Sequence, residues 1–172
     1  SGYAMYQVNV SAPYPSAIIK FNGTLKENRK ISVDGTSSIG NVLYPINWNM
    51  SYWTIESVNG SNLEDILFNV PMSNIKYENN SVKVYGLPKF DIQVSKACMF
   101  IFTLYVENTY GNSSTTYQIL EVSEDLPPIV DFSVVSTTLR NPENNYKATL
   151  KITDNTRSPD DDIISKRKID IY

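Results

Sequence analysis

The sequence of 172 residues contains no histidine and a single cysteine. Histidine is the commonest general base and metal ligand near neutral pH, so its absence removes the usual catalytic side chain. Cys98 cannot form a disulfide within the chain, and its apolar neighbours predict a buried, unreactive thiol. The carboxylates Asp91, Asp65 and Glu64 lack the paired arrangement that a glycosidase needs. We therefore expect a protein that is not an enzyme.

Positive charge and long apolar runs are also scarce. Fifteen Lys and Arg residues stand against eighteen Asp and Glu residues, which gives a net charge of −3. Nucleic acids and anionic membranes require a basic face, so we expect neither as a partner. No run of 18 apolar residues occurs, and we expect no membrane insertion in this segment.

What the sequence does contain favours β-structure. Twelve tyrosines and many Ser and Thr residues accompany short alternating stretches, separated by turn signals such as Asn59-Gly60. Every position of the stretch Ala97 to Val106 is β-prone, which predicts a central strand. Only Asn62 to Asn69 also fits a short helix, and a strand fits it equally well. The pattern predicts an all-β protein built as an antiparallel β-sandwich.

Two tryptophans mark the expected core. The alternation of Ile46 to Glu56 slips between Met50 and Trp53, which predicts a bulge or two separate strands. The predicted core contains Trp48 or Trp53, together with Phe100, Phe102, Leu104, Val106 and Ile119.

A repeat organises the chain. The stretch Tyr6 to Phe21 aligns without gaps with Tyr117 to Phe132, an offset of 111 positions. The second copy contains Pro127-Pro128, which predicts a short, stiff hinge. We expect residues 1–11 to be the closing strand of a preceding repeat, residues 12–124 a complete domain, and residues 125–172 the N-terminal part of a second repeat. The strand expected in residues 1–11 could pair with the exposed sheet edge of a neighbouring molecule or repeat.

Four short motifs resemble the PKD (polycystic kidney disease) repeat, an immunoglobulin-like β-sandwich. Pro127 to Ser133 is similar to the opening strand of that family, Thr153 to Ile164 to its acidic loop, and Phe102 to Gly111 to its closing hairpin. In the first unit, the loop that begins at Asp34 is also similar. The acidic loop departs from the family at Asp161, where a Gly is usual, and the family's Asp-Phe-Gly-Asp turn is absent.

The resemblance implies tandem PKD-like sandwiches, the second incomplete, of the kind found in surface or secreted proteins of AT-rich bacteria such as clostridia. It implies a non-catalytic structural or adhesive module, located outside the cell or at its surface. Its partners would be neighbouring repeats and a protein or polysaccharide ligand. One alternative is an accessory carbohydrate-binding domain of a secreted hydrolase, and another is a phage or appendage structural protein.

An acidic loop in the second unit is the candidate metal site. It places four carboxylates within nine residues, and hard oxygen ligands of this kind suit Ca²⁺. Its spacing does not match an EF-hand, and nearby Lys and Arg residues could neutralise the acids instead. The first unit keeps only Asp34, so we expect no metal there. The candidate calcium ligands are Asp154, Asp160, Asp161 and Asp162.

Tyrosines and sequons are two further candidate features. Tyrosines in or near turns could stack on a sugar, although tyrosine is also an ordinary residue at the rim of a sandwich. These tyrosines are Tyr14, Tyr44, Tyr52, Tyr77, Tyr85 and Tyr110. Six Asn-x-Ser/Thr sequons could carry glycans in a eukaryote or archaeon but would reflect composition in a bacterium. They begin at Asn9, Asn22, Asn49, Asn59, Asn79 and Asn112.

Overall fold

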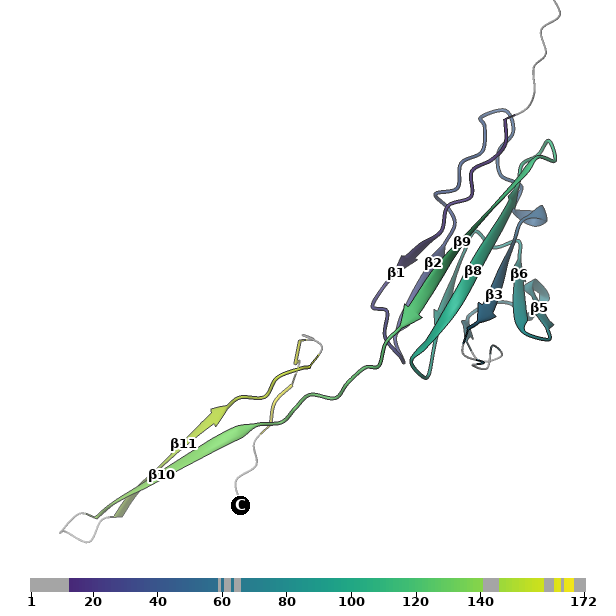
Figure 1. Ribbon diagram of the computed structural model, residues 1–172. Coiled ribbons are helices and arrows are strands. Elements are labelled where there is room, and N and C mark those ends of the chain that lie inside the picture. Colours follow the sequence, from purple (N-terminus) through teal and green to yellow (C-terminus); the bar gives the residue numbers. More distant parts are fainter. Residues whose placement is uncertain are drawn as a thin grey trace, which may run out of the picture. The chain divides into compact units, whose positions relative to one another are not determined.

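A computed structural model gives the fold of this chain (Figure 1). The chain divides into two units, Ser1–Glu124 and Asp125–Tyr172. The described part is mostly β-strand in antiparallel sheets and contains no α-helix, which confirms the predicted all-β class. The structure describes residues 13–58, 60, 63, 66–140, 146–159, 163, 164 and 166–168. The expected closing strand at residues 1–11 lies outside this part.

One sheet of the first unit has four strands in the order β1-β2-β7-β4. They are β1 (Lys20–Asn22), β2 (Lys30–Asp34), β7 (Lys89–Gln93) and β4 (Leu67–Phe68). β2 and β7 pair antiparallel along their whole length. Alternate side chains of both strands point to the same buried face, as the period of two in a strand requires.

The other sheet of the first unit has five strands in the order β5-β6-β3-β8-β9. They are β5 (Ile75–Glu78), β6 (Ser81–Tyr85), β3 (Tyr52–Ser57), β8 (Cys98–Glu107) and β9 (Ser113–Val122). β8 lies between β3 and β9 and alternates strictly between buried and half-buried side chains, which confirms the predicted central strand.

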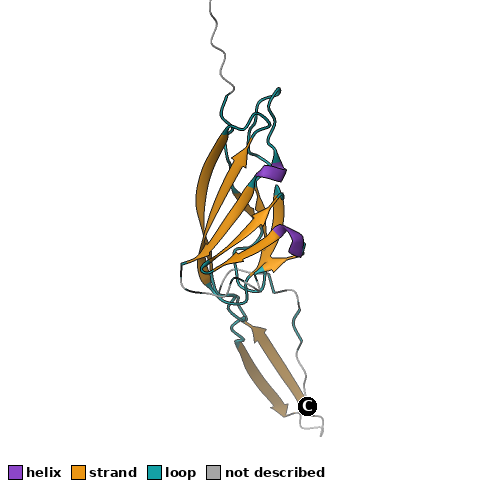
Figure 2. Cartoon of the chain, turned by 90° about the vertical axis from the view of Figure 1, so that its right-hand side faces the viewer, coloured by secondary structure: helices purple, strands orange, loops and turns teal. Residues whose placement is uncertain are grey.

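The core lies between these two facing sheets (Figure 2). Trp53 of β3 contacts Phe90 of β7 with ring centroids 5.5 Å apart, and Phe21 of β1 contacts Phe102 of β8 at 5.2 Å. The Trp53 indole N–H donates to the backbone oxygen of Leu87 at 2.8 Å, so its one polar group is satisfied inside the core. Burial of each such side chain stabilises the fold by about 1.5–3 kcal/mol.

Most of the predicted core residues are confirmed, but the prediction that Ile119 belongs to the core is wrong. Trp53, Phe100, Phe102, Leu104 and Val106 are fully buried, whereas Ile119 is 53% exposed. Leu120 and Val122 of β9 are buried in its place. The register explains the difference, because Leu120 pairs with buried Phe100 while Ile119 pairs with the outward-facing Ile101.

The parity slip before Trp53 is a helical turn, so the predicted bulge or second strand is wrong. Residues Trp48–Met50 form a 3₁₀ helix, η1, and β3 begins after it. Ser51 fastens this turn, since its hydroxyl donates to the Asn47 oxygen at 2.8 Å and accepts from the Glu107 amide at 3.1 Å. A second 3₁₀ helix, η2, spans Met72–Asn74.

The second unit contains a two-stranded sheet. β10 (Phe132–Arg140) pairs antiparallel with β11 (Tyr146–Asp154). Beyond the strands, Ile129 and Arg157 exchange two backbone hydrogen bonds of 2.9 and 3.2 Å and extend the pairing. Val130, Phe132, Val134 and Val135 are between 50% and 73% exposed, so side chains on both faces of β10 are open to solvent at this end of the sheet.

Candidate functional site

The end of β11 forms a turn held by one carboxylate. The Thr156 amide donates to Asp154 Oδ1 at 2.9 Å, and Arg167 Nε lies 3.1 Å from Asp154 Oδ2. The hydrogen bonds from the Thr156 hydroxyl and amide, aided by the charge of Arg167, hold the pKa of Asp154 below its usual value. This carboxylate is therefore ionised and already has a cationic partner.

The described residues include only one of the four predicted calcium ligands, Asp154. Asp160, Asp161 and Asp162 lie outside the described residues, and Asp154 uses both carboxylate oxygens on Thr156 and Arg167. Within the described part of the chain, no group of three Cys, Asp or Glu side chains is placed to hold a metal. Calcium binding by the acidic loop stays a prediction.

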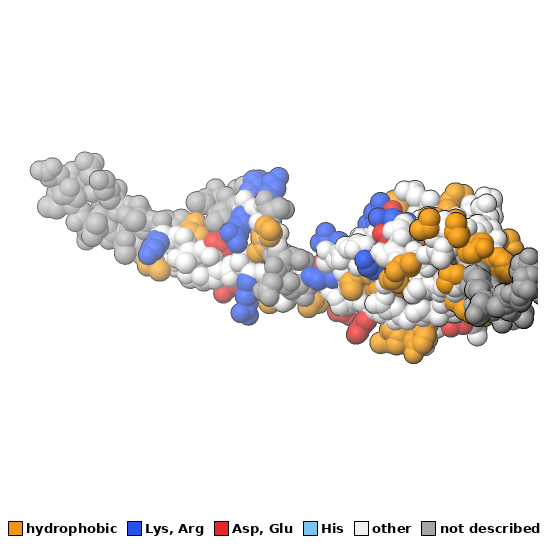
Figure 3. Space-filling view, turned by 90° about the horizontal axis from the view of Figure 1, so that it is seen from above, with side chains coloured by type: hydrophobic (Ala, Val, Ile, Leu, Met, Phe, Trp, Pro, Cys, Tyr) orange, Lys and Arg blue, Asp and Glu red, His pale blue; other side chains and the backbone are white. Residues whose placement is uncertain are grey.

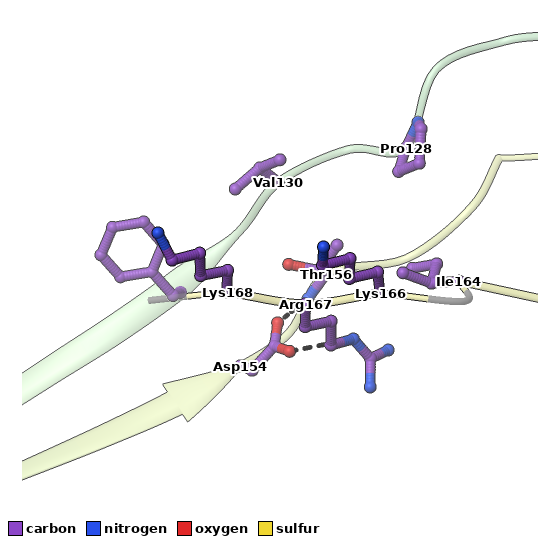
Figure 4. A pocket seen from close by; sticks show the side chains of 9 residues that line it. Pro128, Val130, Asp154, Thr156, Ile164, Lys166, Arg167 and Lys168 are labelled. Carbon is purple, nitrogen blue, oxygen red and sulfur yellow. Dashed lines mark hydrogen bonds and ion pairs between the residues drawn. The ribbon is translucent and has the colours of Figure 1, made fainter. Parts of the chain in front are cut away.

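A hollow of about 460 Å³ lies beside this turn (Figure 4). Pro128, Val130 and Phe132 contribute apolar surface, and Lys166, Arg167 and Lys168 contribute positive charge. Asp154, Thr156 and Ile164 complete the lining. An anionic group with an apolar body would suit this combination chemically. Asp154, the one candidate calcium ligand that lies within the described residues, lines the hollow.

The first unit builds the same kind of turn at the end of β2. Asp34 Oδ1 accepts hydrogen bonds from the Thr36 amide at 2.8 Å and the Thr36 hydroxyl at 2.6 Å. Lys89 Nζ lies 3.6 Å from Asp34 Oδ2. The hydrogen bond from the Thr36 hydroxyl is the main cause that lowers the pKa of Asp34, with smaller contributions from the Thr36 amide and Lys89.

The two turns share the same hydrogen bonds and the same kind of ion pair. In both units an Asp ends the second strand of a hairpin, a Thr two positions later bonds to it, and a basic side chain neutralises it. A reciprocal pair of backbone hydrogen bonds then joins the chain before the hairpin to the chain after it. These pairs are Ser16 with Ile39 and Ile129 with Arg157.

Three tyrosines form a row across the outer face of the five-stranded sheet. Tyr52 of β3 pairs with Tyr85 of β6 on one side and with Tyr105 of β8 on the other. The ring centroids lie 5.5 and 4.8 Å apart, and Lys83 Nζ lies 5.6 Å from the Tyr52 ring. Tyr52 therefore has a tyrosine ring on each side, and all three tyrosines are half buried.

Tyr105 joins two predicted residues in this row, although the sequence reasoning missed it. Its hydroxyl donates to Glu107 Oε2 at 2.9 Å. A bond with Ser113 lowers the pKa of Tyr105, but the Glu107 bond, burial and the negative charge of Glu107 outweigh it, so the pKa is raised. The alternation of β8 shows that Tyr105 faces outward, but only the strand register places it beside Tyr52.

The remaining predicted residues do not join the row. Tyr14, Tyr44 and Tyr110 belong to one end of the first unit, where Tyr44 and Tyr110 make a ring contact at 5.2 Å. Tyr77 lies on β5. Asp91 forms a surface ion pair with Lys30 at 2.8 Å, whereas Glu64 and Asp65 lie outside the described residues. Cys98 is buried, as predicted.

Comparison with known proteins gives no match: no family model, curated protein or solved structure corresponds to this chain. Among the residues that the structure describes, no helix has the length and apolar character needed to cross a bilayer.

Proposed function

We propose that the chain is a non-catalytic structural or adhesive repeat module of a surface-exposed or secreted multidomain protein. The observation that carries the proposal is the hairpin and Asp-Thr turn that occurs once in each unit. A construction repeated along one chain is typical of tandem modules, whose repeats act as spacers and contact surfaces. The repeat unit that we propose is a PKD-like, immunoglobulin-like sandwich.

The surface chemistry of the first unit supports a structural role. Its space between the sheets is filled by one apolar cluster. Several of its charged side chains pair with one another on the outside, as Lys30 does with Asp91 and Lys83 with Glu78. Neighbouring repeats of the same chain are the partners that we propose first.

Surface labelling of intact cells tests this proposal. An antibody against the purified chain should decorate unpermeabilised cells of the source organism or detect the protein in the medium. Treatment of intact cells with protease should remove the signal. Labelling that requires permeabilised cells would contradict the proposal.

Carbohydrate binding is the second candidate, and the exposed Tyr117 on the strand next to the tyrosine row favours it. Tyr117 of β9 is 71% exposed, and its strand borders β8, which carries Tyr105. Sugar rings stack on exposed aromatic faces, so Tyr117 would supply the exposed ring beside the half-buried tyrosines of the row. A glycan array tests this candidate: Tyr117→Ala should abolish specific binding, and Tyr117→Phe, which keeps the aromatic ring, should retain it. A blank array would remove the candidate.

A further inference from the structure

The hollow beside the end of β11 belongs wholly to the second unit. Every residue that lines it falls within Asp125–Tyr172, and its volume of about 460 Å³ is in the range of small-molecule sites. Pro128 and Val130 lie along one side of it, and Lys166 and Arg167 lie along the other (Figure 4). A hollow of this size can hold a ligand of one or two rings, but it cannot seat a folded partner.

The lining of the hollow is positive, although the chain as a whole is acidic. Lys166, Arg167 and Lys168 stand against one carboxylate, Asp154, so three positive charges and one negative charge leave +2, whereas the whole chain carries −3. Lys and Arg side chains lie beside hydrophobic ones on the second unit, in the left-hand part of Figure 3. Lys166 forms no ion pair with any residue that the structure describes. Its ammonium is therefore available to an anionic ligand.

The apolar side chains of the lining are open to solvent. Val130 is 73% exposed and Phe132 is 59% exposed, and Pro128 lies next to them in the lining. One face of a sugar ring consists of C–H groups, and such a face packs well on an aromatic side chain. A ring of this kind would cover Phe132 while it keeps its polar groups turned toward the charged side of the hollow.

Asp154 discriminates between two kinds of anionic ligand. Its Oδ1 accepts from the Thr156 amide, its Oδ2 pairs with Arg167, and its side chain remains 31% exposed. An acid with a purely hydrocarbon body would displace water from this carboxylate and give no hydrogen bond in return, which costs free energy. The hydroxyl groups of a sugar donate hydrogen bonds and replace that water. The lining therefore favours an acid that also carries hydroxyl groups.

We propose that this hollow binds a hexuronate residue of an acidic polysaccharide. The carboxylate of the sugar pairs with Lys166, its hydroxyl groups donate to Asp154, and its C–H face covers Phe132. A single sugar residue has few atoms and the hollow is open, so the expected dissociation constant is about 1 mM. The inference deepens the adhesive part of the proposed function and rests on it, and it concerns the second unit rather than Tyr117 of the first.

NMR titration of the purified, isotope-labelled full chain tests the proposal with small ligands of defined chemistry. The methyl glycosides of glucuronate and galacturonate are the probes, and at least one of them should shift the backbone resonances of Asp154, Thr156 and Lys166. The matching neutral methyl glycosides of glucose and galactose, which lack only the carboxylate, should bind about tenfold more weakly. Cyclohexanecarboxylate, which lacks the hydroxyl groups, should also bind about tenfold more weakly.

Two variants of equal charge change separate a site at Lys166 from general attraction. Lys166→Gln removes the ammonium at the hollow and should weaken binding of the uronate about fivefold. Lys151→Gln is the matched control, because Lys151 is exposed on β11 and, three positions before Asp154, points to the opposite face of the strand. This variant should bind like the parent chain. The spectrum of each variant without ligand shows that the second unit keeps its fold.

Several results would overturn the proposal. No shift with either uronate at about 20 mM would do so. Equal binding of a uronate and its neutral glycoside, equal binding of cyclohexanecarboxylate, or equal weakening by Lys166→Gln and Lys151→Gln would also do so. Tighter binding of N-acetylglutamate amide, the unit of an acidic peptide, would overturn it in favour of a protein partner. Surface labelling of cells tests the module function separately, so failure of one measurement is distinguishable from failure of the other.

Discussion

Gly35 stands against the ring of Trp53 at the centre of the first unit. A Cβ at this position would lie 2.8 Å from Trp53 Cζ2 and 3.0 Å from Leu104 Cδ2. Both of those side chains are fully buried and belong to the core. The turn after Asp34 can therefore approach the core only because residue 35 has no side chain.

Gly35→Ala should destabilise the first unit by about 1–3 kcal/mol, because a buried ring and a buried Leu would have to move. Chemical denaturation followed by tryptophan fluorescence measures the change. In a Trp53→Phe background, where the clashing atom is absent, the same substitution should cost less. An equal cost in both backgrounds would show that contact with Trp53 is not the cause.

The Asp34 turn predicts a pH dependence. The pKa of Asp34 is lowered below 3.8 in the folded state, so its contribution is present above about pH 4 and is lost as the pH falls through the folded pKa. The melting temperature of the parent chain should therefore drop more steeply between pH 5 and pH 2.5 than that of Asp34→Asn. Parallel curves over this range would show that Asp34 does not contribute.

Some features of the two Asp turns and of the tyrosine row could be predicted from the sequence, and others could not. Asp34 and Asp154 could be recognised as turn residues, and the Lys and Arg residues near the acidic loop could be recognised as partners for its acids, as Arg167 is for Asp154. Lys89, the partner of Asp34, lies on another strand and could not be recognised in this way. Tyr52 and Tyr85 could be selected as tyrosines near turns, whereas the contacts of Tyr52 with Tyr85 and with Tyr105 depend on a register that spans three strands. Local pattern specifies which residues are available, and strand pairing decides which of them meet.

At the scale of elements, β9 shows where pattern alone fails. Its sequence contains Ile119 and Leu120 side by side, so either one could face the core. β8 could be predicted because its alternation has no such ambiguity, and its pairing with β9 then places Leu120 inside. The 3₁₀ helix η1 could not be predicted either, since a slip in the alternation indicates only that a regular strand is interrupted and not what interrupts it.

Alanine substitutions at the two neighbouring positions test the phase of β9. Leu120→Ala should destabilise the first unit by about 2–5 kcal/mol, because it leaves a cavity beside Phe100. Ile119→Ala should cost less than about 1 kcal/mol, because its side chain is half exposed. Urea unfolding of both variants gives the comparison. A larger cost at Ile119 would reverse the assignment of the two faces.

At the scale of the whole molecule, the buried cluster predicts that the first unit folds without the second. Every buried member of the cluster lies between Ile19 and Val122. The fragment Ser1–Glu124 should therefore keep the cooperative melting transition of the full chain, measured by circular dichroism. Asp125–Tyr172 alone should show no cooperative transition, since a two-stranded sheet is at most marginally stable in water. A fragment Ser1–Glu124 that fails to fold would show that the second unit is required.

The pairing at Ser123 also determines how the first unit would respond to mechanical load. Ser123 bonds to Leu25 at 3.1 Å and to Glu27 at 2.9 Å, in a parallel arrangement. The chain enters the unit at Pro13 beside Asn108, at the opposite end of β8 and β9. Tension between Pro13 and Ser123 would therefore run along the strands and shear both bonds at once. Separation of residues 25–27 from Ser123 would then require both backbone bonds, and the bond from the Ser123 hydroxyl to the Leu25 oxygen, to break together.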